Sequence, residues 1–125
     1  MRPDAVSALH NRGQALLRLN RFSDALAVFD RLCGLGPGDA EVHAHRGNLL
    51  MILNRPAEAL SAYDHALALR PEQAQVWNCR GNALRCLRRP EEALASIDRA
   101  LALHPAYVEA YNNRAVLLRD LNRPH

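Results

Sequence analysis

Apolar residues recur at intervals of three and four positions along most of the chain, a spacing typical of helices with one buried face. In residues 40–53, for example, Val42, Leu49 and Leu53 fall on the same side of a helix. The apolar stretches are separated by short breaks rich in Asn, Arg, Gly and Pro, which end one helix and allow another to begin. The pattern predicts helices over residues 4–19, 22–33, 40–53, 56–69, 74–87 and 90–103, and one more in 108–125.

The same short phrase returns at a fixed period. Gly13, Gly47 and Gly81 stand 34 residues apart, each after an arginine, and Ala115 replaces glycine in a fourth copy. A period of this size indicates stacked structural repeats that share one continuous core. We therefore expect a single domain over residues 1–125, with repeats at 6–39, 40–73 and 74–107 and a partial repeat at 108–125.

Each repeat has small and bulky residues at matching places in its second helix. We expect the alanine that lies 12 residues after each glycine to face it, because two small residues let helix backbones approach closely in an antiparallel hairpin. One bulky residue follows four positions later. The alanines are Ala25, Ala59 and Ala93, and the bulky residues are Phe29, Tyr63 and Ile97.

These residues carry a resemblance to a known family. The third unit is similar to the tetratricopeptide repeat, a 34-residue helix–turn–helix, through Trp77, Gly81, Leu84, Ala93, Ile97, Ala100 and Pro105. The first two units carry the same pattern in the same phase. The resemblance implies an all-α fold: an α-solenoid of antiparallel helix hairpins, with about seven helices wound into a right-handed superhelix.

Two charged positions repeat with the period, and the first of them, an arginine, stands where the family more often has an aliphatic residue. An arginine precedes each glycine or its equivalent, and an aspartate follows each bulky residue of the second helices. We predict ion pairs between successive units, which fix the register of the stack more than they add stability. The predicted pairs are Asp30 with Arg46, Asp64 with Arg80, and Asp98 with Arg114.

Composition narrows the class of protein further. All 16 basic residues are arginine, which together with the many alanines is typical of a GC-rich, bacterial coding background. The formal net charge is only +3 and no long basic run is present, so nucleic acid is not an expected partner. No signal peptide or membrane-spanning stretch is recognisable, and we expect a cytoplasmic protein that does not bind membranes.

Histidine and cysteine do not form a recognisable metal or catalytic motif. His43 and His45 are two residues apart and would point to opposite sides of a helix. His45 and Cys79 occupy the same position in adjacent first helices, but two ligands fall short of the four that structural zinc usually needs. A Cys–His pair would also lack an enclosed pocket. We therefore expect no metal, no cofactor and no enzyme activity, with reduced cysteines.

The resemblance places the candidate binding site on the concave wall made by the first helices. The positions that face ligands in the family are mostly amides here, and amides can bond a peptide main chain without selecting its side chains. The expected partner-binding residues are His10, Asn11, Gln14, His45, Asn48, Asn78, Asn82, Arg85, Asn112 and Asn113. Further residues at the same repeat positions are Glu41, Ala44, Gln75, Cys79, Glu109 and Arg119.

The expected function is a protein–protein interaction scaffold that binds an extended peptide or partner protein. The amide wall resembles the arrays of O-linked N-acetylglucosamine transferases, which leaves open a regulatory or substrate-binding fragment of a larger enzyme such as a glycosyltransferase. It does not resemble repeats that hold acidic chaperone tails with Lys and Arg. A third hypothesis is homo-oligomerisation, because the last helix, without a partner helix, should expose an apolar side beside Tyr111. Its residues are Val116, Leu117, Leu118 and Leu121.

Overall fold

The fold is a stack of seven helices in the part of the chain that the structure describes. This structure is a computed structural model, and it describes residues 3–34 and 40–122, with side chains from residue 6 onwards. Within these ranges it contains no strand, as expected for an all-α protein. The helices are α1 (Pro3–Arg18), α2 (Phe22–Gly34), α3 (Ala40–Ile52), α4 (Pro56–Leu69), α5 (Ala74–Cys86), α6 (Pro90–Leu103) and α7 (Val108–Asn122).

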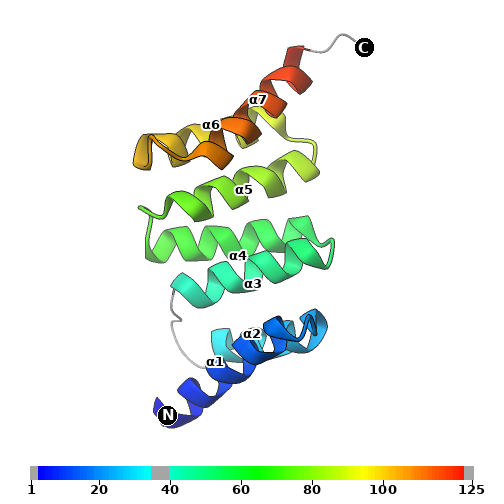
Figure 1. Cartoon of the computed structure of the whole chain (residues 1–125), viewed down its shortest axis with the longest axis vertical. Helices are drawn as coiled ribbons and strands as arrows, with labels where there is room; N and C mark the ends of the chain where they lie inside the picture. Colours follow the sequence, from blue (N-terminus) through cyan, green and yellow to red (C-terminus); the bar gives the residue numbers. More distant parts are fainter. Residues whose placement is uncertain (1–2, 35–39, 123–125) are drawn as a thin grey trace.

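Helices that follow each other in sequence are neighbours in space. Figure 1 shows an elongated array in which the chain passes from one end to the other without returning. The pairs α1–α2, α3–α4 and α5–α6 form hairpins, and α2–α3, α4–α5 and α6–α7 form the contacts between units. A stack of this kind keeps every contact local, as in other solenoids.

The turn inside each hairpin is built in the same way three times. In the second unit Asn54 has a positive φ of 62°, and its N–H donates to the Met51 carbonyl at 3.0 Å. The next N–H, from Arg55, donates to the Leu50 carbonyl at 2.7 Å. This is the Schellman arrangement, which satisfies the last carbonyls of a helix. The following helix then begins at Pro56, where a missing N–H has no cost.

Glycine accommodates the bulky residue of each hairpin. A Cβ atom added to Gly47 would lie 2.6 Å from Tyr63 Cε1, and one added to Gly81 would lie 2.5 Å from Ile97 Cγ1. The expected approach of glycine and alanine is seen in the third unit, where the Ala93 carbonyl oxygen lies 3.2 Å from the added Gly81 Cβ, but the bulky side chain is the closer contact. The glycine is required because the large side chain packs directly against its backbone.

The three predicted ion pairs between units are confirmed. Arg80 Nε donates to Asp64 Oδ1 at 2.7 Å, and Arg114 Nε donates to Asp98 Oδ1 at 2.9 Å. Arg46 Nε donates to Asp30 Oδ1 in the same way. Each pair joins the second helix of one hairpin to the first helix of the next. The aspartates are about half exposed and the arginines partly exposed, so the effect of the pairs lies in orientation more than in net free energy.

The last helix is packed more closely than its sequence predicts. Leu117 is fully buried with Ala110 against residues of α5 and α6, so its expected exposure is wrong. The large apolar residues of α7 that are exposed are Val108 (70 %) and, as expected, Tyr111 (51 %). Val116, Leu118 and Leu121 are half-buried. Ala115, which stands where the other units have glycine, is also exposed. No second helix faces it within the described residues, so a Cβ atom is tolerated there.

Candidate functional site

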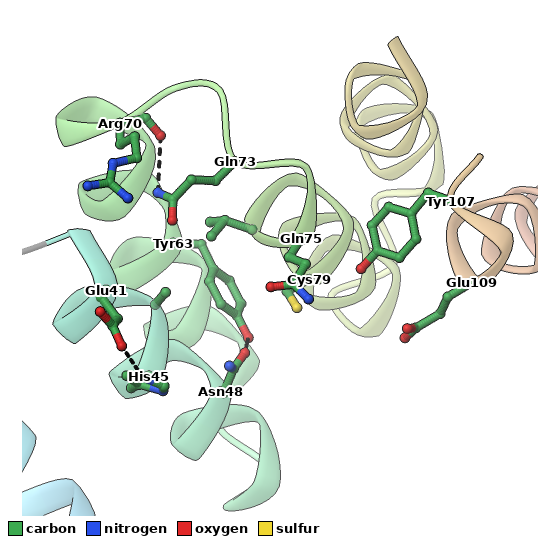
Figure 2. Close-up of a pocket in the computed structure, with 12 residues that line it drawn as sticks. Glu41, His45, Asn48, Tyr63, Arg70, Gln73, Gln75, Cys79, Tyr107 and Glu109 are labelled. Carbon is green, nitrogen blue, oxygen red and sulfur yellow. Dashed lines mark hydrogen bonds and ion pairs between the residues drawn. The ribbon is translucent and has the colours of Figure 1, made fainter. Parts of the chain in front are cut away.

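A cavity of about 470 Å³ opens on the side of the stack formed by the first helices. It takes side chains from α3, α4, α5, the α4–α5 connection and the start of α7, so three successive units contribute to it. Figure 2 shows the side chains converging on this space. The lining residues are Glu41, Ala44, His45, Asn48, Tyr63, Arg70, Gln73, Gln75, Val76, Cys79, Tyr107 and Glu109.

Two of the ten expected binding residues, His45 and Asn48, line this cavity. Five more lining residues come from the same family-derived repeat positions, namely Glu41, Ala44, Gln75, Cys79 and Glu109. Seven of the twelve lining residues therefore come from positions that the family resemblance places on the concave wall. Five residues that reach the cavity from elsewhere were missed: Tyr63, Arg70, Gln73, Val76 and Tyr107.

Tyr63 reaches the cavity from the second helix of its hairpin. Its ring packs against the backbone of Gly47, and its hydroxyl donates a hydrogen bond to Asn48 Oδ1 at 2.7 Å. The first and third units have Phe29 and Ile97 at this position. Of the three hairpins, therefore, only the second has a hydroxyl group on its bulky residue. That difference between copies was the one signal in the sequence that could have added Tyr63 to the site.

The central groups of the cavity are neutral hydrogen-bonding groups. Burial is the main cause that raises the pKa of both the Tyr63 phenol and the Cys79 thiol. A thiol whose pKa is raised is a poor nucleophile at neutral pH, because the thiolate is the reactive form. His45 Nε2 is 3.3 Å from Glu41 Oε1. The arrangement thus offers hydrogen-bond donors and acceptors.

Asn78 is not part of the open wall. Its side chain is buried (1 % exposed), and its Oδ1 accepts a hydrogen bond of 3.0 Å from Asn113 Nδ2. The expectation that Asn78 contacts a partner is therefore corrected: it ties α5 to α7 inside the stack. Asn113 is half-buried and has part of its hydrogen-bonding capacity taken up by this contact.

The remaining expected residues lie outside the cavity. His10 is 3.4 Å from Gln14 Nε2, and its ring centroid is 6.3 Å from that of His45, so these residues extend the same wall towards α1. Arg85 forms an ion pair with Asp120 at 3.5 Å, beyond the cavity along α5 and α7. Three amides are not brought into the cavity either: Asn11, Asn82 and Asn112.

Charges are unevenly placed around the cavity. Glu109, at the start of α7, helps to raise the pKa of Cys79 and of Tyr107, although burial is the larger cause for both. Glu41 lies on α3 at the other side, beside His45. Arg70, the only Arg that lines the cavity, lies in Figure 2 well away from Glu109.

Two properties of the described part of the chain bear on other kinds of site. Among residues 3–34 and 40–122, no group of three or more His, Cys, Asp or Glu side chains is arranged to hold a metal ion. In the same ranges, none of the helices combines the length and the apolar character needed to cross a membrane.

Repeat architecture and site geometry together define a helical repeat protein. Residues 40–73 and 74–107 match a tetratricopeptide repeat family model, and residues 1–40 match a second tetratricopeptide repeat model. The chain therefore belongs to the tetratricopeptide repeat family. The sequence has no match among the curated proteins.

Solved structures share this fold at low sequence identity. The first tetratricopeptide domain of Spaghetti (RPAP3), bound to the HSP90 peptide SRMEEVD, has a TM-score of 0.92 and 22% identity, and the match covers 98% of each chain. MamA has a TM-score of 0.90 and 18% identity, with 95% of this chain and 70% of that chain covered. The tetratricopeptide repeat domain of Arabidopsis OM64 has a TM-score of 0.86 and 21% identity, with 91% of this chain and 94% of that chain covered.

Proposed function

We propose that this chain is a protein-interaction scaffold that binds an extended peptide segment in the cavity between α3 and α7. The observation that carries the proposal is the set of neutral donors and acceptors that three successive units direct into one cavity. Asn48, Tyr63 and Gln75 are the clearest members of that set. Amides and hydroxyls can bond the N–H and C=O groups of a main chain, which an extended segment leaves available.

Relatives in fold support the general mode of binding. The RPAP3 domains were solved with peptides from HSP90 and HSP70, SRMEEVD and SGPTIEEVD. In this chain the family-derived wall has Glu41, His45, Cys79 and Glu109, where acidic-tail repeats have Lys and Arg. The segment bound here is therefore proposed to differ in charge from those acidic tails.

A library experiment tests the scaffold function. Random-sequence dodecamer peptides displayed on phage would be selected against the immobilised chain, and their affinities measured by fluorescence anisotropy. The test variant combines Asn48→Ala, Tyr63→Phe and Gln75→Ala. The first two changes remove both partners of one hydrogen bond, which limits the loss of stability. Ser61→Ala, an exposed change on α4 outside the cavity, is the control.

We expect selected peptides to bind the triple variant at least about tenfold more weakly, because several main-chain hydrogen bonds of about 1 kcal/mol each are lost. Circular dichroism should show unchanged helicity, and Ser61→Ala should bind like the original chain. Equal affinity for the triple variant, or failure to recover any peptide, would contradict the proposal.

Exposed apolar residues on α7 favour self-association as a second candidate. Val108 and Tyr111 share the open side of this helix, and exposed apolar groups of this kind often mark an interaction surface. Sedimentation equilibrium over a hundredfold range of concentration tests it. Self-association should weaken in a Val108→Ser, Tyr111→Ser variant, and a strictly monomeric chain would refute it.

A further inference from the structure

One end of the cavity is acidic and has no basic side chain to balance it. Glu109 is exposed, lines the cavity and forms no ion pair within the described residues. Its neighbours in the cavity are Tyr107, which immediately precedes α7, and Cys79 from α5. Figure 2 shows Tyr107 and Glu109 directed towards Cys79. We call these three residues the acidic end.

The electrostatic effect of Glu109 reaches both of its neighbours. It helps to raise the pKa of the Cys79 thiol and of the Tyr107 phenol, after the larger effect of burial. Arg70, the arginine that lines the cavity, lies well away from Glu109 in Figure 2. The other glutamate of the cavity, Glu41, lies 3.3 Å from His45 instead.

Building on the proposed scaffold function, we propose that the acidic end is a subsite for a Lys or Arg side chain of the bound segment. The cation would lie against the Glu109 carboxylate, and its methylene groups would cover the half-buried Tyr107 ring. Long basic side chains commonly combine these two contacts, because the stem is apolar while the head is charged. A charge-assisted hydrogen bond to the carboxylate gives the contact its direction.

Other classes of side chain fit the acidic end less well. An acidic side chain would meet Glu109 at close range, and like charges repel. An apolar side chain would cover the carboxylate without offering it a donor, and removing a charge from water without a partner is costly. The acidic end thus distinguishes segments by charge, while the amides and hydroxyls of the same cavity hold the main chain.

Three matched heptapeptides test this subsite. Each has the sequence Ala-Ala-Gln-X-Gln-Ala-Ala with blocked termini, where X is arginine, its neutral isostere citrulline, or glutamate. Binding is measured by NMR titration of the 15N-labelled chain, followed through the backbone amides of Cys79, Tyr107 and Glu109. The variants are Glu109→Gln and, as a control, Glu91→Gln, an exposed change on α6 that does not line the cavity.

In the original chain, the arginine peptide should bind about three- to tenfold more tightly than the citrulline peptide, and the glutamate peptide most weakly. Glu109→Gln should remove the preference for arginine, and Glu91→Gln should retain it. Equal binding of all three peptides, or a preference that survives Glu109→Gln, would overturn the subsite and leave the scaffold function in place. If none of the peptides shifts the cavity amides, both proposals fail.

Discussion

Arg80 on α5 and Asp64 on α4 are joined by a 2.7 Å hydrogen bond between residues 16 positions apart in the chain. The same contact occurs at Arg46–Asp30 and Arg114–Asp98, always between one hairpin and the next. The relationship therefore recurs at each of the three junctions between units. An arginine and an aspartate that look scattered in the sequence thus define a regular connection between units.

We expect this connection to contribute little to stability by itself. A double-mutant cycle with Asp64→Asn and Arg80→Gln should give a coupling free energy of about 0.5–1 kcal/mol, because both side chains are partly exposed. Urea denaturation measures it, and added salt should reduce it. A coupling of about 3 kcal/mol would show instead that the pair is a main source of stability.

Gly81→Ala should strongly destabilise the third hairpin. The added Cβ would lie 2.5 Å from Ile97 Cγ1, so the helices would have to separate, at a cost of about 1–3 kcal/mol. Gly34→Ala is the matched control, because a Cβ there meets nothing within 4 Å. That change should raise stability by up to about 0.5 kcal/mol through helix propensity. Thermal unfolding would compare the two, and equal effects would contradict the packing argument.

Arg88→Asn should stabilise the chain. Arg88 has a positive φ of 60° at the turn where the first two units have Asn20 and Asn54. Asparagine adopts this conformation more readily than arginine, so we expect a gain of about 0.5–1 kcal/mol. Asn54→Ala, the reverse type of change, should cost a similar amount. Denaturant midpoints measure both, and a loss of stability in Arg88→Asn would refute the prediction.

His43 should make stability depend on pH. Burial, His65 and Arg46 lower its pKa in the folded chain below the ordinary value of about 6.5. The unfolded chain therefore binds a proton first as pH falls, and the stability present above about pH 6.5 is progressively lost below it. The test variant is His43→Tyr, because the fourth unit has tyrosine (Tyr111) at the same repeat position. Between pH 7.5 and pH 5, the melting temperature of this variant should fall less than that of the original chain. Parallel melting curves for the two proteins would contradict this.

Most of the fold was predictable because the repeat fixes the phase of every helix. Prolines at 56 and 90 mark helix starts directly, and α4 and α6 have the predicted bounds. Helices α3 and α5 end one residue earlier than predicted, where the turn residues leave helical geometry. The pairing of arginines with aspartates could also be predicted, since residues that repeat with the period must meet the same neighbour in each unit.

The site was predictable only as a wall. The repeat positions taken from the family include His45 and Asn48, which line the cavity. A repeat position alone does not show how much of each side chain the next unit covers. Asn78 has the same repeat position as Ala44, which lines the cavity. The Asn78 side chain is nevertheless buried, and it accepts a hydrogen bond from Asn113 on α7. Tyr107 was missed because it lies in the connection before α7, outside the first-helix positions that the family resemblance supplies.

The cavity draws its side chains from two consecutive hairpins and from the start of α7, and this has a consequence for unfolding. Repeat arrays can lose their end units separately, because each unit contacts only its neighbours. A peptide that bridges α3, α5 and α7 would bind only when all three units are folded, so its binding free energy would be shared among them. With the peptide bound, the units that it contacts should unfold together in one cooperative transition. Without the peptide, the terminal units should unfold before the others.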